Sequence, residues 1–199
     1  MERAILARHA ESEFSAVGIV NGDPSVAGGL TERGRAEARR LGDLIADEDI
    51  GLCVTTEFPR TIETADVALA GRAVPRLVVR DLNDPRLGAL EGCALAELRA
   101  WLTSNGPSAA PTGGETRISA VRRYCRGFRT VLDRPERTVL IIAHGLPVTL
   151  ATLATTDRAL PLSLEGVQVE HAAPHSLSSA ELERSVERME AWADEVEAA

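Results

Sequence analysis

The sequence contains no lysine, and all 22 of its basic residues are arginine. This absence excludes Schiff-base chemistry, and arginine does not release its proton near neutral pH. A general acid, a general base or a nucleophile must therefore be His, Asp, Glu, Ser, Thr or Cys. Because arginine is so frequent in the 199 residues, any single arginine is weak evidence for a function.

Cysteine and aromatic residues are also scarce. Cys53, Cys93 and Cys125 lie far apart without a C-x-x-C spacing, which argues against a disulfide framework and a thiolate metal site. Aromatic residues make up 3% of the chain, too few for the stacking surfaces of single-strand binders. The formal net charge of −8 argues against polyanion binding. We expect no nucleic-acid partner.

Long hydrophobic runs are missing as well. No apolar run approaches the roughly 18 residues of a membrane span, and no charged-then-apolar leader begins the chain. We therefore expect a soluble, cytoplasmic protein without a membrane partner. With 44% hydrophobic residues, the chain is long enough for one core and short for two, which predicts a single domain over residues 1–199.

Short apolar segments alternate with helical patterns. Strands are predicted at 3–7, 50–56, 76–82 and 137–145. Helices are predicted after an N-cap at Thr31, from Pro59 to about residue 70, and at 95–102, 117–133, about 146–155 and about 178–197. This alternation predicts an α/β fold, a three-layer α/β/α sandwich with a mostly parallel central sheet.

Four polar residues stand at the predicted strand ends. Arg8 and His9 end the first strand, Arg60 begins the helix after the second, and His144 ends the segment "TVLIIAH". Taken singly, each has an ordinary explanation: His144 could satisfy a backbone carbonyl, and Arg60 could pair with a carboxylate on its own helix. Open α/β sheets bind ligands at the carboxyl ends of their strands, so the joint placement favours one site.

Six motifs in order resemble the histidine phosphatase superfamily, in its phosphoglycerate-mutase-like branch. They are "LARHAESE", "LTERGRAEARRLG", "TTEFPRTIETA", "LNDPRLGALEG", "PTGGETR" and "VLIIAHGLPV". The resemblance covers roughly residues 3–155 and leaves the last forty or so without a match. Where family members place a final strand, "EGVQVE" is short and "HAAPHSLSSAELE" resembles the entry to a helix.

The resemblance implies a metal-independent phosphomonoesterase that needs no cofactor, and the chemistry of the residues agrees. Guanidinium groups of Arg8 and Arg60 suit phosphate oxygens. A neutral His9 can attack phosphorus and form a phosphohistidine. By the resemblance, His144 donates a further charged hydrogen bond, and the helix that starts at Gly145 can add its N-terminal dipole.

The leaving group also needs a proton. Asp84 stands where the family usually has Glu, with Glu91 as the rival donor and Asp81 behind it; Asp84 could instead be a turn residue before Pro85. Ser15 stands where the family often has Asn, and it is either a phosphate-binding hydroxyl or a plain loop serine.

A short cap segment is predicted around 93–115. Residues 102–114 carry no arginine, although Arg86 and Arg99 lie upstream, where we expect a turn surface and a helix face. Such a segment cannot hold a second anionic group by charge, which favours phosphate release from a small substrate whose remainder is neutral or weakly polar. The alternatives are a phosphoglycerate mutase and a non-catalytic phospho-ligand-binding protein.

Two further questions concern a metal site and the oligomeric state. His171 and His175 have i, i+4 spacing, but Pro174 lies between them and no third ligand is near, so we expect no metal site there. The sequence does not decide the oligomeric state, a homodimer included.

Overall fold

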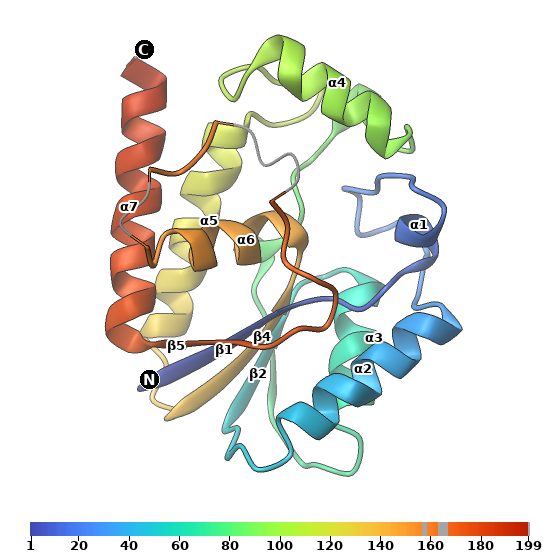
Figure 1. The fold of residues 1–199 in the computed structure, drawn as a ribbon, viewed down its shortest axis with the longest axis vertical. Helices are drawn as coiled ribbons and strands as arrows, with labels where there is room; N and C mark the ends of the chain where they lie inside the picture. Colours follow the sequence, from blue (N-terminus) through green and yellow to red (C-terminus); the bar gives the residue numbers. More distant parts are fainter. Residues whose placement is uncertain (157–158, 163–166, 199) are drawn as a thin grey trace.

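A five-stranded sheet lies at the centre of the computed structural model, which describes residues 1–156, 159–162 and 167–198 (Figure 1). The strand order is β3-β2-β4-β1-β5, and only β5 is antiparallel to its neighbour. The mostly parallel sheet is therefore as predicted. The strands are β1 (Arg3–Arg8), β2 (Leu52–Thr55), β3 (Arg76–Val78), β4 (Thr138–Ala143) and β5 (His175–Ser178).

Helices cover both faces of the sheet. Alternate residues of β4 face opposite sides: Leu140 and Ile142 pack with α2 (Glu32–Leu44) and α3 (Pro59–Ala68). Val139 and Ile141 pack with the other layer, which consists of α5 (Arg117–Leu132), α6 (Gly145–Leu153) and α7 (Ser179–Ala198). All six residues of β4 are buried, as its continuous apolar run predicts. The three-layer α/β/α prediction is confirmed.

Two helices begin where the sequence signals at Thr31 and Pro59 predict. The Thr31 hydroxyl accepts a hydrogen bond from the backbone N–H of Gly34 at 2.9 Å and caps α2. Pro59 occupies the first turn of α3. The two helices α1 (Glu13–Ala16) and α4 (Leu95–Asn105) lie outside the two main layers (Figure 1).

Two predictions at the sheet edges need correction. The predicted strand 76–82 stops at Val78, and Arg80–Leu82 form a 3-10 turn, η1, because Leu82 is buried against Gly127 of α5. The segment expected as a helix entry contains β5, which pairs with β1 before α7 begins. A second 3-10 turn, η2, spans Gly88–Leu90. No helix among the described residues is both long and apolar enough to span a bilayer.

Candidate active site

The predicted site residues come together at the carboxyl ends of β1 and β4. There a pocket of about 350 Å³ opens, and six of the predicted residues line it: Arg8, His9, Ser15, Arg60, Asp84 and Gly145. His144 is fully buried and is not among the residues that line the pocket, but it contacts Asp84 and Arg60, which do. Residues more than 130 positions apart thus share one site because parallel strands end at the same edge of the sheet.

His9 is held with one ring nitrogen free of its proton. Nδ1 lies 2.8 Å from the carbonyl oxygen of Ala10, which only accepts hydrogen bonds, so Nδ1 carries the proton. The lone pair of Nε2 faces the Nε–H of Arg60 at 3.2 Å. Burial, reinforced by the charge of Arg60, lowers the pKa of His9 well below its usual value. The ring is therefore neutral near pH 7 and has nucleophilic character at Nε2.

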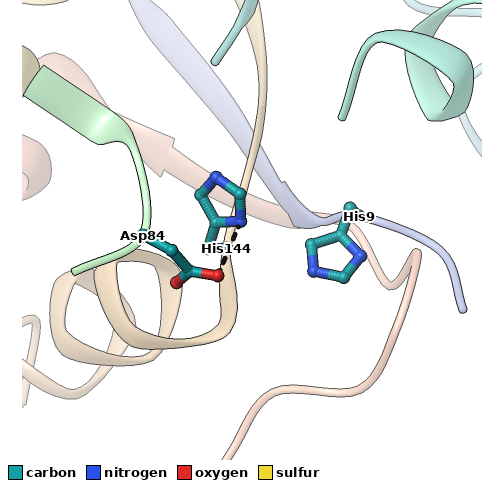
Figure 2. Close-up of side chains that lie close together, drawn as sticks. All are labelled: His9, Asp84 and His144. Atoms are coloured by element: carbon teal, nitrogen blue, oxygen red, sulfur yellow. Dashed lines mark ion pairs between the residues drawn. The ribbon is translucent and has the colours of Figure 1, made fainter. Parts of the chain in front are cut away.

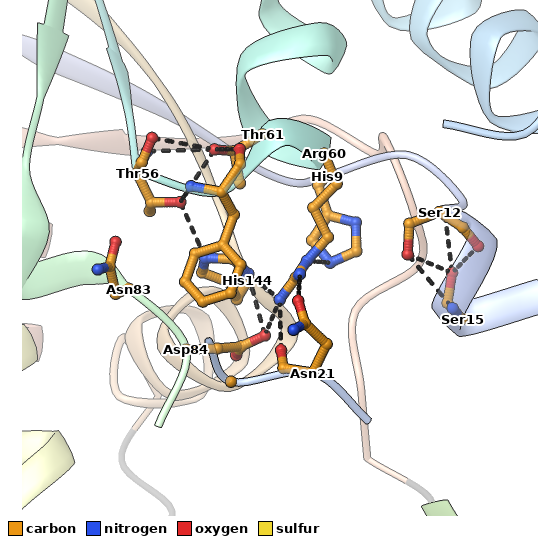
Figure 3. Close-up of polar contacts among 12 residues, drawn as sticks. His9, Ser12, Ser15, Asn21, Thr56, Arg60, Thr61, Asn83, Asp84 and His144 are labelled. Atoms are coloured by element: carbon orange, nitrogen blue, oxygen red, sulfur yellow. Dashed lines mark hydrogen bonds and ion pairs between the residues drawn. The ribbon is translucent and has the colours of Figure 1, made fainter. Parts of the chain in front are cut away.

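Arg60 is the central residue of the hydrogen-bond network in the site (Figure 3). Its buried guanidinium donates to Oδ1 of Asn21 at 2.7 Å, to the carbonyl of Asn21 at 3.0 Å and to Oδ2 of Asp84 at 2.7 Å. It also lies 4.1 Å from the centre of the Phe58 ring, which supports it from one face. Sequence reasoning missed Asn21, whose loop position carries no recognisable pattern.

Asp84 and His144 form a coupled pair. Nδ1 of His144 lies 3.0 Å from Oδ2 of Asp84, and its Nε2 lies 2.9 Å from the hydroxyl of Thr56. Burial raises the pKa of Asp84, but the neighbouring cationic groups outweigh burial and hold that pKa well below its usual range. Burial lowers the pKa of His144 despite the nearby carboxylate. The contact with His144, followed by the permanent charge of Arg60, lowers the pKa of Asp84 and keeps it ionised.

Arg8 differs from Arg60 in having unused donors. Its Nη1 makes only long contacts of 3.4 Å, to Oε1 of Gln168 and the carbonyl of Val169. Its Nε is buried and has no hydrogen-bond partner among the described residues. A Cβ on Gly145 would lie 3.4 Å from that nitrogen, so the glycine at the start of α6 leaves the guanidinium room. A buried cationic donor without a partner calls for an anion.

The three side chains drawn in Figure 2 could in principle hold a metal ion. Among the described residues, the ligand atoms of His9, Asp84 and His144 lie within 4.8 Å of one another. The guanidinium of Arg60, however, lies within 3.3 Å of an atom of each. A divalent cation would meet that fixed positive charge at every ligand, so the cluster does not fit a metal.

Of the three candidate proton donors, only Asp84 lines the pocket. Glu91 is exposed, and its carboxylate accepts from the backbone N–H of Gly22 at 2.8 Å and of Leu87 at 3.0 Å. Asp81 faces Arg126 of α5 at 3.6 Å.

Ser15 lines the pocket but uses its hydroxyl locally. The hydroxyl donates to the carbonyl of Ser12 at 2.9 Å and accepts from its N–H at 2.8 Å, which closes a capping box on α1 (Figure 3). The phosphate-binding role of Ser15 stays a prediction.

His171 is a pocket residue that sequence reasoning considered only as a metal ligand. Its Nδ1–H donates to the carbonyl of His9 at 2.7 Å, and the two rings lie 5.4 Å apart. The next residue, Ala172, has φ +50°, the one positive φ outside glycine among the described residues. Strained backbone of this kind concentrates at functional sites, and here it presents His171 to the pocket wall.

Arg123 of α5 is a second residue that sequence reasoning missed. It donates to the carbonyls of Asp81 and Asn83, both at 2.9 Å, and to Oε1 of Glu115 at 2.6 Å. Glu115 also accepts from the N–H of Arg86 at 3.0 Å. The buried Arg123–Glu115 pair therefore fixes the backbone on both sides of Asp84.

Comparison with known families gives one match across nearly the whole chain. The model of the histidine phosphatase superfamily (branch 1) matches residues 4–195. The expectation that the resemblance ends near residue 155 is therefore wrong. The family match includes β5 and most of α7, whose short, mixed sequences carry no strong motif.

Relatives of similar sequence carry the names of both mutases and phosphatases. The chain is 32% identical over 179 residues to the 2,3-bisphosphoglycerate-dependent phosphoglycerate mutase of Mycobacterium tuberculosis, with 71% of each chain covered. It is 30% identical over 169 residues to the adenosylcobalamin/alpha-ribazole phosphatase of Salmonella typhimurium, with 79% of this chain and 82% of the relative covered.

Solved structures show the same fold. The alpha-ribazole phosphatase of Shigella flexneri superimposes with a TM-score of 0.76 at 23% identity, over 87% of this chain and 89% of that one. YhfR of Bacillus stearothermophilus superimposes with a TM-score of 0.75 at 26% identity and the same coverage.

Proposed function

We propose, from the premise that this chain belongs to the histidine phosphatase superfamily, that it hydrolyses a small phosphorylated metabolite through a phosphohistidine on His9. The observation that carries the proposal is the buried Nε of Arg8, which lacks a partner among the described residues and lies in the same pocket as the neutral His9. A phosphate dianion satisfies that donor. No metal is needed, because the guanidinium groups of Arg8 and Arg60 supply the positive charge.

In the first step, the bound phosphate draws the Nε–H of Arg60 away from Nε2 of His9, and the freed lone pair of Nε2 attacks phosphorus in line. The N–P bond forms, the bond from phosphorus to the leaving oxygen breaks, and that oxygen takes a proton from Asp84. His144 and Arg60 stabilise the charge that develops on the phosphoryl oxygens. The imidazole ring of His9 keeps its Nδ1 proton, which the carbonyl of Ala10 accepts as a hydrogen bond.

Asp84 must first gain that proton. His144 and Arg60 hold the pKa of its carboxyl low, but a bound phosphate dianion shares the guanidinium of Arg60 and adds negative charge beside the carboxylate. Both effects raise the pKa of Asp84 and favour its protonated form. In the second step, Asp84 accepts a proton from water, which attacks phosphorus; the N–P bond breaks, and inorganic phosphate leaves with His9 restored.

The test is a rapid-quench experiment with a radiolabelled phosphomonoester in EDTA. The trapped protein should carry phosphate that is stable to base and labile to acid, and His9→Ala should abolish the label. His175→Ala is the matched control, because His175 lies in β5 outside the pocket-lining residues. Label that remains in His9→Ala, or that sits on Ser, Asp or Cys, contradicts the proposal.

A mutase is the second candidate, favoured by the mycobacterial relative named above. A mutase returns the phosphoryl group to another hydroxyl and must keep water from the phosphoenzyme. The two activities separate in a paired assay: phosphate release from sugar and alkyl phosphates, beside interconversion of 2- and 3-phosphoglycerate with and without 2,3-bisphosphoglycerate. Interconversion faster than every release reaction would favour the mutase. Phosphate binding without any turnover would favour a binding protein.

A further inference from the structure

A second cavity, of about 160 Å³, adjoins the pocket that contains His9. Six residues of α4 line this cavity, together with the loop residues Ala109 and Pro111. Four of the α4 residues are the apolar Leu95, Leu98, Trp101 and Leu102, and the other two are Arg99 and Thr103. This apolar cavity is distinct from the charged pocket in composition.

The two cavities share part of their lining. Pro85, Leu87, Leu95, Leu98, Leu146 and Gln168 line both of them. Pro85 directly follows Asp84, so the apolar cavity opens beside the carboxyl group that is proposed to protonate the leaving oxygen. The group attached to that oxygen therefore has the apolar cavity as its nearest space.

The charged residues of the apolar cavity do not turn it into an anion site. The carboxylate of Glu115 is paired with Arg123 at 2.6 Å. Arg117 donates to the backbone carbonyl of Leu162. Arg99, which we expected on a helix face, does line the cavity, but its residue is exposed to solvent, where water screens its charge.

The helix α4 has apolar side chains that remain partly exposed to water. None of its residues is fully buried, although Leu95, Leu98, Trp101 and Leu102 are partly covered. An apolar ligand between this helix and the rest of the cap would remove those side chains from water, which is favourable. The volume of the cavity is close to that of an engineered cavity of about 150 Å³ that holds benzene.

From these observations we infer that the substrate is a phosphomonoester whose leaving group carries an uncharged, apolar ring, bound in the cavity beside α4. The inference rests on the proposed function, because it assigns the phosphate to the pocket of His9. It narrows the substrate class from any small phosphorylated metabolite to aryl, arylmethyl and similar ring-bearing phosphates.

Calorimetry with non-hydrolysable phosphonates tests the inference without turnover. Benzylphosphonate should bind about 10- to 100-fold more tightly than methylphosphonate, the gain expected for burying one ring. 4-Carboxybenzylphosphonate should bind more weakly than benzylphosphonate, because its carboxylate loses water. Equal affinity for the methyl and benzyl compounds overturns the inference. Tighter binding of the carboxylate overturns the uncharged ring and makes Arg99 and Arg117 an anion site.

Variants locate the ring. Ala109→Trp fills the cavity and Trp101→Ala removes part of its wall, so each should reduce the benzyl-to-methyl affinity ratio to within about threefold while methylphosphonate binds as before. Glu97→Ala is the matched control, because Glu97 lies on α4 but does not line the cavity. A ratio that survives both cavity variants places the ring elsewhere and contradicts the inference.

The two proposals fail separately. If ring selectivity appears in binding but no phosphomonoester is hydrolysed and His9 is never labelled, the proposed function is wrong and the cavity assignment stands as a binding site. If His9 is labelled and methyl, glycerol and benzyl phosphates react with equal kcat/KM, the phosphatase stands and the ring assignment is wrong.

Discussion

The two ends of the substrate pocket are built in opposite ways. At the histidine end, around His9, Arg60 and His144, the side chains are buried and extend from the sheet or from the first turn of a helix. At the cap end, the cavity beside α4, no helix residue is fully buried. The difference teaches that the proposed chemical step depends on the core of the fold, whereas the proposed leaving-group selectivity depends on a helix with no fully buried residue.

Loss of Arg60 should have the largest effect. Arg60→Met leaves the Asp84 carboxylate and the Asn21 amide oxygen without their guanidinium and removes a donor from the phosphoryl oxygens. We expect kcat/KM for any phosphomonoester to fall by about 10³-fold, near the upper range for one charge-stabilising donor. Steady-state kinetics check this, with circular dichroism to show that the variant is folded.

Arg80→Met is the matched control, because Arg80 forms an exposed ion pair with Glu57. Its kcat/KM should stay within about threefold of the unmodified protein. If both arginine variants lose kcat/KM equally, or if Arg60→Met retains its kcat/KM, then catalysis at the histidine end does not depend on Arg60.

Asp84→Asn should come next. Removal of the proton donor should lower kcat for an alkyl phosphate by about 10²-fold, and by less for a 4-nitrophenyl ester, whose leaving oxygen needs little protonation. Glu91→Gln keeps one of the two oxygens that accept from Gly22 and Leu87, and should change kcat by less than about threefold. The reverse pattern would make Glu91 the donor.

The strand-end residues could be predicted because their signals are local. An apolar run that stops at Arg8 and His9, or at His144, marks the carboxyl end of a buried strand, and parallel pairing brings such ends together. The helix starts at Thr31 and Pro59 are equally local. Short patterns therefore sufficed for the parallel strands, the two faces of the sheet, and the placement of Arg8, His9, Arg60 and His144.

The rest depends on contacts that no short pattern records. His171 donates to the backbone carbonyl of a residue 162 positions away, and Arg123 donates to loop carbonyls about 40 positions away. A carbonyl is present in every residue, so such a contact leaves no signature in the partner's sequence. The strand β5 has Leu177 as its one buried residue, and backbone pairing with β1 decides its conformation.

Arg123→Met tests whether the contacts of Arg123 with the backbone beside Asp84 matter for turnover. We expect kcat to fall by about tenfold, because Asp84 is no longer held in position, while the affinity for inorganic phosphate is unchanged. The substitution also leaves the buried Glu115 carboxylate unpaired, so it should lower the free energy of unfolding by about 3 kcal/mol. Adding Glu115→Gln should restore stability without restoring kcat. Arg123→Lys should recover part of kcat.

Arg122→Met serves as the neighbouring control, because Arg122 pairs with exposed carboxylates of Asp194 and Glu197 on α7. Arg122→Met should change neither kcat nor the free energy of unfolding measurably. Recovery of kcat in the double variant would mean that Arg123 acts on stability alone.

The buried histidine end should also make stability depend on pH. Burial lowers the pKa of His9 in the folded protein, whereas the unfolded chain takes up that proton near pH 6.5. The unfolded state therefore binds one more proton at His9 below pH 6.5, and His9 by itself should lower the free energy of unfolding by up to about 1.4 kcal/mol per pH unit down to its folded pKa. Burial also lowers the pKa values of His144, His171 and His175, which add to the slope in the same direction. Urea unfolding at pH 7.5, 6.5 and 5.5 measures the slope. His9→Gln should make the slope shallower by the contribution of one proton; an unchanged slope would show that His9 titrates normally.

The smallest effect should come from the cap end, and the two tryptophans of the chain provide a direct comparison. Trp192 is buried in α7 at 6% exposure, and Trp192→Ala should lower the free energy of unfolding by about 3–5 kcal/mol. Trp101 is only partly covered on α4, so Trp101→Ala should lower it by less than about 1 kcal/mol. In single-tryptophan proteins, only Trp101 fluorescence should respond to benzylphosphonate. If the two alanine variants lost comparable stability, or if Trp192 fluorescence responded to benzylphosphonate, the cap would belong to the core.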